Sequence, residues 1–498
     1  MLLPLVVNRL WLASAALAAR RFRRALANPA AAQAAVLRGI LRANQRCEAG
    51  CQAGFAAISS VEEFQRCVSL CDYDTIAPAI ARMAAGEAQV LTAEPVRLFE
   101  PSSGSTAAAK LIPYTRRLQR EFQAGLSAWI SNLFGHYPAL ARGPAYWSIS
   151  PLVEPGRRTA GGTPIGFEED SAYLGPLGRL VERALAVPNG VKRLADVETF
   201  RYVTLYYLLH SRELRLVSVW NPTFFTLLLD ALPCWWDALL ADVAQGTLTP
   251  PGALPAEAAA GLRRLRPDPA RARALAAVDP SSPTAAAQVW PRLGLLSCWA
   301  DGAAARDAGE LAARLPHAHL QPKGLLATEA MVSLPWVGAP GAVLALTSHF
   351  LEFEEESGAL RLAHELEVGG VYSVAVTTGG GLYRYRLYDQ VEVVGRVAAT
   401  PCIRFVGKGD RISDRFGEKL TEPFVAACLR ELFERVGLAP AFALLAPEDA
   451  AGAPAYALFV ELKMPLPPGL ATDLDEALRR NFHYDYCRRL GQLGPAQV

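Results

Sequence analysis

The fold is decided by one stretch, Phe99-Glu100-Pro101-Ser102-Ser103-Gly104-Ser105-Thr106-Ala107-Ala108-Ala109-Lys110-Leu111-Ile112-Pro113-Tyr114-Thr115. It surrounds Gly104 with small hydroxyl side chains and places Lys110 shortly after them. Hydroxyl groups and backbone N–H groups in such a loop bind phosphate oxygens. In the P-loop a Gly-Lys-Ser/Thr sequence opens a helix, whereas here Lys110 leads into an apolar pair and Pro113. The stretch therefore predicts a nucleotide-phosphate loop with a strand after it; a Ser-rich surface turn is the alternative.

The flanking sequence extends this pattern on both sides. Val90 to Phe99 is strand-like, and Arg116 to Gly135 repeats apolar residues at helical spacing. We therefore expect the order strand, loop, strand, helix.

Composition sets the class of protein. A chain of 498 residues with 51% hydrophobic residues predicts a globular protein with a large domain and at least one smaller one. The net charge of +2 gives no electrostatic footprint for nucleic acid. Nine cysteines, an odd number, predict reduced thiols in a cytoplasmic protein. Four of them invite a zinc interpretation, but their spacing on helical sequence favours structural thiols: Cys47, Cys51, Cys67 and Cys71.

The N-terminal segment resembles a signal peptide only superficially. Arg9 interrupts its apolar run, and the arginines from Arg20 to Arg24 come after that run. An amphipathic helix fits this order better. No segment reaches about 18 consecutive apolar residues without a charge, so we expect no integral membrane span.

A second signal for chemistry is Leu325-Leu326-Ala327-Thr328-Glu329. An apolar run that ends in Thr-Glu at the carboxyl end of a strand places polar side chains where α/β sheets bind ligands. Thr328 is expected to hydrogen-bond phosphate and Glu329 to hold a divalent cation.

A third signal is the segment from Gly381 to Gly395. Tyr383 to Leu387 alternates as a strand, and Val391 to Val394 continues as a second one. Asp389 is expected at the turn between them, where its carboxylate would accept two ribose hydroxyl groups. A hairpin aspartate with no ligand is the alternative.

A fourth signal is Ile403 to Ser413, in which Gly407 and Gly409 flank Lys408. An apolar strand followed by glycine-flanked charges predicts a hinge, with a smaller α+β unit after it.

Clustered aromatic residues at Trp220, Phe224 and Phe225 follow strand-like sequence and adjoin Asn221-Pro222, which predicts a helix start. They are expected either to wall an apolar ligand or to belong to the core.

Taken in order, these four signals resemble the adenylate-forming enzyme superfamily. More closely they resemble its acyl-acid amido synthetases, known from plant auxin and jasmonate conjugation, in a bacterial branch. The resemblance covers the chain from about Phe64 onward. It implies an α/β fold with an α+β C-terminal part: residues 1–405 would form the large adenylate-forming domain with the phosphate loop and acyl pocket, and residues 406–498 a small mobile domain.

The resemblance also implies a reaction. A small-molecule carboxylate would attack the α-phosphate of ATP with Mg²⁺ present, and the acyl-adenylate would then pass its acyl group to an amine such as an amino acid. Lys408, Glu329 and Thr328 would be catalytic, and Glu329 would hold the metal. The nucleotide would contact Ser102, Ser103, Gly104, Ser105, Thr106, Lys110, Thr328, Asp389, Arg404 and Lys408. The sequence indicates neither the acid, the amine nor the oligomeric state.

Two departures from the family pattern bear on activity. Lys408 stands where the superfamily commonly has arginine, which keeps the charge and loses the bidentate fork. The superfamily also carries a lysine near its C-terminus, whereas the last lysine here is Lys463, so we expect the small domain to be incomplete at its end. The alternatives are an acyl-CoA or other thioester ligase and a catalytically impaired nucleotide-binding homologue.

Overall fold

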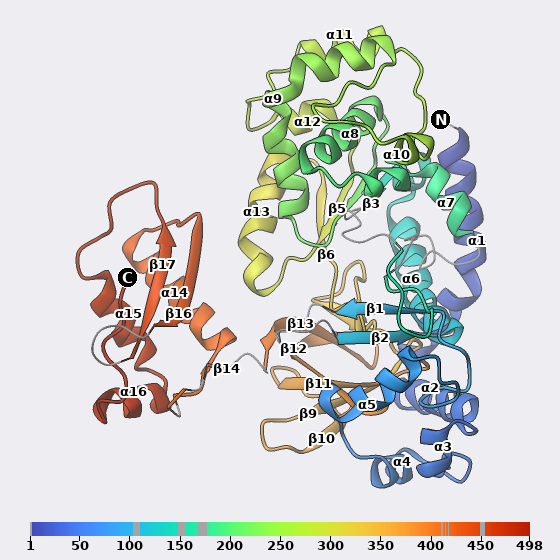
Figure 1. Cartoon of the computed structure of the whole chain (residues 1–498), viewed down its shortest axis with the longest axis vertical. Coiled ribbons are helices and arrows are strands. Elements are labelled where there is room, and N and C mark those ends of the chain that lie inside the picture. The colour runs from blue at the N-terminus through green and yellow to red at the C-terminus, as the bar shows by residue number, and fades with distance from the viewer. Residues whose placement is uncertain are drawn as a thin grey trace. The chain divides into compact units, whose positions relative to one another are not determined.

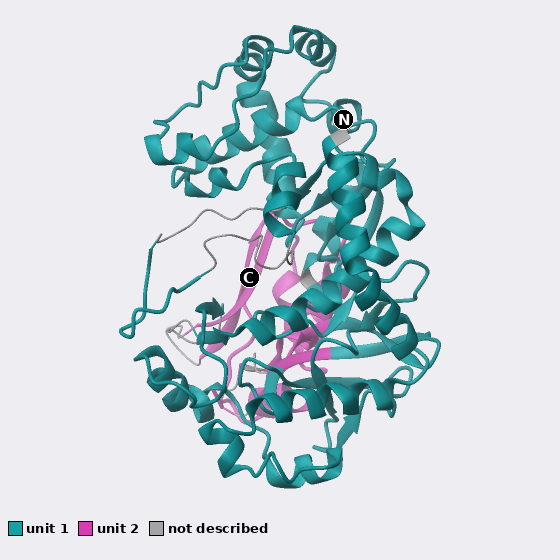
Figure 2. Cartoon of the chain, turned by 90° about the vertical axis from the view of Figure 1, so that its right-hand side faces the viewer, with its two compact units in different colours: residues 1–387, 391–405 teal, residues 388–390, 406–498 magenta. Residues whose placement is uncertain are grey.

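The computed structural model describes residues 2–102, 110–147, 156–166, 177–409, 412–413, 415–416, 418–448 and 454–498. The chain divides into two compact units, coloured separately in Figure 2. Unit 1 comprises residues 1–387 and 391–405, and unit 2 comprises residues 388–390 and 406–498. Each unit has a hydrophobic core of its own.

Unit 1 begins with the expected N-terminal helix, α1 (Leu2–Ala25), which packs along α6 (Arg116–His136) (Figure 1). Val7, Trp11 and Phe22 of α1 are buried in the main core. The shorter helices that follow α1 are α2 (Pro29–Asn44), α3 (Glu48–Gln52), α4 (Val61–Cys67) and α5 (Tyr73–Ala84). Later short elements are η1 (Pro138–Arg142), α7 (Gly178–Ala184), η3 (Asn189–Arg193), α10 (Ala256–Ala260), α11 (Pro269–Ala276), α12 (Ala285–Val289) and η4 (Gly302–Ala304).

The phosphate-loop stretch forms an antiparallel hairpin. Strands β1 (Leu98–Ser102) and β2 (Lys110–Tyr114) pair from Leu98↔Tyr114 to Ser102↔Lys110. Helix α6 follows at once, and Thr115 caps it by accepting the N–H of Leu118. The predicted order of two strands and a helix is confirmed, although the first strand begins at Leu98 rather than Val90. The residues predicted as the loop, 103–109, lie outside the described residues.

A parallel sheet in the order β3-β4-β5-β6 forms the second layer of unit 1. Its strands are β3 (Ala145–Trp147), β4 (Leu216–Ser218), β5 (Leu295–Cys298) and β6 (His319–Pro322). Leu216 and Leu295 pack into the main core with α6, whereas Val217 and Leu296 pack into a second core. Alternation along each strand therefore gives the sheet one face toward α6 and one toward the second core.

The second core is built on α8 (Val197–His210), α9 (Thr223–Gln245) and α13 (Ala305–Arg314). Among the described residues, α9 is the helix whose length and mean hydropathy would suit a membrane span. Phe225, Leu228, Leu232 and Leu239 of α9 are nevertheless buried in this core, and buried core helices commonly have this composition. Figure 1 shows α8, α9 and α12 gathered beside β3 and β5.

The largest sheet has the order β10-β9-β11-β12-β13-β8-β7. Its strands are β7 (Ser333–Leu334), β8 (Ala342–Leu344), β9 (Phe350–Glu354), β10 (Leu360–Leu362), β11 (Val371–Thr377), β12 (Tyr385–Val397) and β13 (Thr400–Lys408). Parallel and antiparallel sheets together make the fold mixed α/β, which agrees with the α/β class expected from the sequence.

The prediction of a turn at Asp389 is wrong. Asp389 lies inside β12, one continuous strand from Tyr385 to Val397. Tyr388 has a φ of +61°, so the backbone adopts the left-handed region at this one residue while strand pairing continues on both sides. Buried and partly exposed residues continue to alternate through this point, and Asp389 occupies one of the buried positions. The sequence suggests a turn because a charged residue stands where a buried strand normally has an apolar one.

Unit 2 contains β14 (Ile412–Ser413), β15 (Leu420–Thr421), α14 (Glu422–Val436), β16 (Phe442–Glu448), β17 (Ala455–Glu461), α15 (Leu470–Leu478) and α16 (Phe482–Arg489). Strands β16 and β17 pair antiparallel from Phe442↔Glu461 to Glu448↔Ala455. Helices α15 and α16 follow this pair, so unit 2 combines antiparallel strands with helices.

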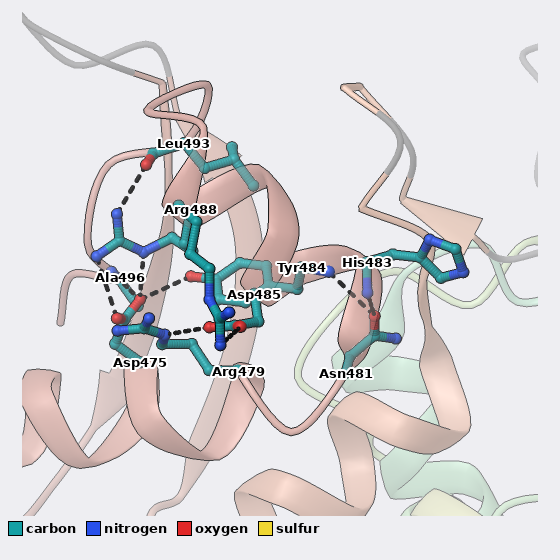
Figure 3. Close-up of polar contacts among 10 residues, drawn as sticks. Asp475, Arg479, Asn481, His483, Tyr484, Asp485, Arg488, Leu493 and Ala496 are labelled. Carbon is teal, nitrogen blue, oxygen red and sulfur yellow. Dashed lines mark hydrogen bonds and ion pairs between the residues drawn. The ribbon is translucent and has the colours of Figure 1, made fainter.

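A buried carboxylate ties the end of unit 2 together (Figure 3). Asp475 of α15 accepts hydrogen bonds from the Tyr484 hydroxyl at 2.9 Å, from Arg488 Nε at 3.0 Å and from the Ala496 N–H at 3.0 Å. Burial by itself would raise the pKa of Asp475, but the bonds from Arg488, Ala496 and Tyr484 outweigh it and lower the pKa. The ionised carboxylate therefore joins α15, α16 and the terminal segment.

We expect Asp475→Asn to destabilise unit 2 by about 1.5–3 kcal/mol, because it removes charge-assisted hydrogen bonds from a buried site. Hydrogen exchange of the α15 and α16 amides in the full chain measures this effect. The stabilisation is present above the unfolded-state pKa of about 3.9 and is lost as the pH falls through the lower folded-state value.

The matched control is Asp473→Asn on the same helix, where the carboxylate is more exposed and lies 3.4 Å from Arg435. Such a pair contributes about 0–1 kcal/mol. Equal protection loss in both variants would contradict the assigned role of Asp475.

Candidate functional site

The phosphate-loop hairpin brings Ser102 and Lys110 opposite each other at its open end. Ser103, Gly104, Ser105 and Thr106 lie outside the described residues. The Lys110 ammonium is 5.6 Å from the centre of the Tyr73 ring, and the Tyr73 hydroxyl accepts the N–H of Leu111 at 2.9 Å. Tyr73 of α5 thus fixes the base of the loop and leaves the Lys110 charge without a carboxylate among the described residues.

Thr328 and Glu329 stand at the tip of a tight turn. Leu326 and Met331 form a β-bridge, and the Ala327 N–H donates to the Ala330 carbonyl at 2.9 Å. The turn follows the carboxyl end of β6 after a short connection. The Tyr114 hydroxyl, at the end of β2, donates to the Thr328 carbonyl. The structure therefore brings the first and second sequence signals together.

The first signal also contacts the glycine turn that directly precedes the third signal. Thr115 Oγ1 donates to the Gly379 carbonyl at 3.1 Å, and the Gly379 N–H donates to Glu121 at 2.8 Å. A Cβ atom at Gly379 would lie 2.6 Å from atoms of Arg117 and Glu121. Only glycine permits this approach of the turn to the start of α6.

The arginines of the third signal have structural partners. Arg384 is 3% exposed, pairs with Glu352 of β9 at 3.0 Å and donates to the carbonyls of Gln65 and Val68. Arg386 pairs with Glu354, also on β9, at 2.8 Å. The Arg384 guanidinium thus joins the large sheet to the end of α4 and the residue after it.

Asp389 and Lys408 form a pair in unit 2. Asp389 is 4% exposed, and its Oδ1 lies 3.4 Å from the half-exposed Lys408 ammonium. The Gly409 N–H donates to the Tyr388 carbonyl at 2.7 Å, which holds β12 and β13 together at this point. Two predicted site residues from separate signals are thus adjacent, although Asp389 occupies a strand.

Arg404 is placed differently from these two. Its side chain is 56% exposed, and it pairs with Glu392 of β12 at 2.6 Å. An exposed ion pair of this kind is weak, so its guanidinium is available for exchange with another anion.

The four N-terminal cysteines do not gather into a metal-binding group. Cys47 is buried and donates to the Asn44 carbonyl, whereas Cys51 and Cys67 are exposed. Cys71 donates to the Tyr383 carbonyl. Within the described part of the chain no group of three His, Cys, Asp or Glu side chains has metal-ligand geometry.

Sequence reasoning missed Lys323. Its ammonium donates to Ser218 Oγ at 2.6 Å and lies 5.3 Å from the ring centres of both Trp129 and Trp220. Burial lowers the pKa of Lys323 to about 8, and the charge interaction with the Cys298 thiol opposes this only in part. No motif marks this lysine, but one signal was available: it is one of six lysines in an arginine-rich chain and directly follows a strand of the parallel sheet.

Comparisons with known proteins show the family of the chain. Two family models match the chain, the GH3 family N-terminal domain at residues 18–310 and the GH3 family central domain at residues 342–408. The probable indole-3-acetic acid-amido synthetase GH3.4 of Oryza sativa subsp. japonica is 26% identical over 488 residues, or 88% of this chain and 76% of the relative. The jasmonoyl-L-amino acid synthetase JAR6 of Nicotiana attenuata is 24% identical over 396 residues, or 72% of this chain and 66% of the relative.

Solved structures show the same fold. The AtGH3.15 acyl acid amido synthetase in complex with 2,4-DB superposes with a TM-score of 0.84 at 20% identity, covering 95% of this chain and 87% of that chain. A 2-hydroxyisobutyryl-CoA ligase in complex with 2-HIB-AMP superposes with a TM-score of 0.54 at 11% identity, covering 96% of this chain and 87% of that chain.

The fold is therefore that of an acyl acid amido synthetase, related to those of adenylate-forming ligases. The chain belongs to the GH3 family, since the N-terminal family model alone matches more than half of it. It is an AMP-forming amido synthetase of that family.

We expect Lys323 to titrate near pH 8 in the folded protein. Reductive methylation with ¹³C-formaldehyde labels the lysines, and the ¹³C chemical shifts can be followed against pH. The signal that disappears in Lys323→Arg identifies the residue. A midpoint for that signal at the ordinary lysine value of about 10.4 would contradict the desolvated environment.

Proposed function

We propose that this chain activates a small-molecule carboxylic acid with ATP and transfers the acyl group to an amino acid. The observation that carries the proposal is the junction of the phosphate-loop hairpin with the Thr328-Glu329 turn through Tyr114. The hairpin carries Ser102 and the Lys110 ammonium at its open end, and the turn that Tyr114 contacts carries the Glu329 carboxylate. In-line displacement at phosphorus requires these positioned charges rather than a protein nucleophile.

The roles that we propose follow the motif resemblance. Ser102, Lys110 and the loop residues Ser103 to Thr106 would bind the phosphates, with the Thr328 hydroxyl beside them. The buried Asp389 carboxylate would accept ribose hydroxyl groups, and Lys408, adjacent to it, would neutralise charge on the α-phosphate. Arg404 would exchange Glu392 for a nucleotide oxygen.

The Glu329 side chain suits Mg²⁺. It is half-buried at the tip of a turn, and Mg²⁺ is usually held by one or two carboxylates together with substrate phosphates and water. A single carboxylate here is therefore a sufficient protein contribution. When bound, Mg²⁺ supplies neutralising charge to the phosphate oxygens.

The reaction has two balanced steps. A carboxylate oxygen attacks the α-phosphorus of ATP, the bond to the bridging oxygen breaks, and pyrophosphate leaves. The amine nitrogen then attacks the acyl carbon, AMP leaves, and one proton is released as the amide forms. Both steps need charge stabilisation at the α-phosphate, which is the part that we assign to Lys408.

The relatives suggest the kind of acid. They act on indole-3-acetic acid and on jasmonic acid by their names, which are acids with an apolar body. We infer an acid of this general kind, and from the motif resemblance we place the chain in a bacterial branch. We likewise propose that residues 406–498 form a mobile small domain after residues 1–405, in a cytoplasmic enzyme.

The test of the proposal is acid-dependent exchange of pyrophosphate into ATP across a panel of carboxylic acids, followed by mass spectrometry of amide products with each amino acid. We expect exchange with at least one acid and AMP release that requires an amino acid. Exchange with CoA-dependent AMP release would favour a thioester ligase, and nucleotide binding with no exchange would favour an impaired homologue.

We expect Lys408→Met to lower the exchange rate about 10²–10³-fold, because it removes one preorganised charge. The matched control is Lys463→Met, which removes an exposed lysine elsewhere in unit 2 and is expected to leave the rate unchanged. An equal rate in the wild type and Lys408→Met would remove Lys408 from the site.

A further inference from the structure

The carboxyl ends of β4, β5 and β6 carry side chains, on the side of the sheet that faces α6, to which we have assigned no nucleotide contact. Ser218, Ser297 and Gln321 lie in register across β4, β5 and β6. They point toward α6, because Trp129 of α6 donates to Gln321 at 2.9 Å. Two residues further on come Trp220, Trp299 and Lys323, and alternation places their side chains on the same side.

The backbone keeps these three residues aligned beyond the strands. The Trp299 N–H donates to the Trp220 carbonyl at 2.8 Å, and the Lys323 N–H donates to the Cys298 carbonyl at 3.0 Å. The Trp220 and Trp299 rings are 6.1 Å apart. The edge is therefore an ordered rim, with two indoles and one ammonium on it.

The Lys323 ammonium has fewer hydrogen-bond acceptors than donors among the described residues. It has three N–H donors, and the described residues offer it one acceptor, Ser218 Oγ, and two indole faces. No carboxylate in the described part of the chain pairs with it. Behind it, Ser297 Oγ and Trp147 Nε1 are buried without a hydrogen-bond partner among the described residues. This face therefore has positive charge and polar groups that lack acceptors.

The same rim exposes apolar surface. Trp220 is 38% exposed, Trp299 is 41% exposed, and Phe224 at the start of α9 is 44% exposed. Large aromatic side chains that remain accessible beside a desolvated cation are typical of a ligand site. In open α/β sheets, ligands bind at the carboxyl ends of the parallel strands.

We propose that Lys323, between Trp129 and Trp220, binds a second anionic group of the acyl substrate, so that the enzyme selects an apolar or aromatic acid carrying another carboxylate. This inference rests on the proposed function. A carboxylate held by an ammonium is a poorer nucleophile, so the unmatched charge suits an anchoring group rather than the carboxylate that attacks phosphorus. The indole rings pack against the apolar body of the acid, and the Lys323 ammonium binds the second carboxylate, the one that does not attack phosphorus.

The test compares matched acids that differ in the second charge, 4-methylphenylacetate with 4-carboxyphenylacetate and the corresponding pairs with longer spacers. Isothermal titration calorimetry without ATP measures binding, and pyrophosphate exchange measures kcat/KM. In the wild type we expect at least one pair to favour the dicarboxylate by about 10–100-fold, the range for a hydrogen bond to a charged group.

In Lys323→Met we expect this preference to fall to about 1, while the monocarboxylate of the same pair keeps its affinity within about twofold. Lys323→Arg should retain part of the preference, because it retains the charge. Lys463→Met is the control for loss of an exposed lysine, and thermal unfolding checks that each variant folds.

Two results would overturn the inference: no wild-type preference for any dicarboxylate, or an equal loss for both acids of each pair in Lys323→Met. The second result would assign Lys323 to the reacting carboxylate or to folding. Because calorimetry needs no turnover, a charge preference in binding without pyrophosphate exchange would defeat the proposed function and leave this inference standing.

Discussion

Helix α6 is the constraint on which unit 1 depends, because it bonds to both sheets through buried polar side chains. Trp129 donates to Gln321 of the parallel sheet, Glu121 accepts the N–H of Gly379 beside the large sheet, and Asn132 accepts the N–H of Val337. A buried polar group that loses its partner costs about 1–3 kcal/mol. Rotation or sliding of α6 would break several such bonds together. The helix therefore holds the two sheets of unit 1 in a fixed position relative to each other.

Close packing strengthens the same constraint. A Cβ atom at Gly125 of α6 would lie 2.4 Å from the Met331 sulfur and 2.8 Å from the Ser348 hydroxyl. Met331 is the residue that closes the Thr328-Glu329 turn. The helix that starts directly after the phosphate-loop hairpin therefore also packs against the Thr328-Glu329 turn. One helix thus contacts two motifs that are far apart in the sequence.

Much of this could be predicted from local sequence, and the failures have physical causes. The two strands of the hairpin and α6 followed from the spacing of apolar residues. Asp389 was misplaced because a charged side chain occupies a buried position of a continuous strand, whereas residue type alone predicts a turn there. Arg384 belongs to the ribose motif by sequence, but its pairing with Glu352 depends on a strand about thirty residues away. Lys323 carries no motif, and its environment is created by α6 and β4.

Lys408 and Lys323 differ in the groups that balance their positive charges. Lys408 lies 3.4 Å from Asp389 and remains half-exposed, so a carboxylate of the protein lies beside its ammonium. Lys323 is held against two indoles and one hydroxyl, so its charge is costly in the absence of an anion. Arginine at position 323 would stay charged at any physiological pH and present a wide fork, whereas lysine presents a compact charge whose energy depends strongly on what binds beside it. A site of this kind gains most from a ligand that brings its own negative charge, which is the physical basis for selection among acids of similar shape.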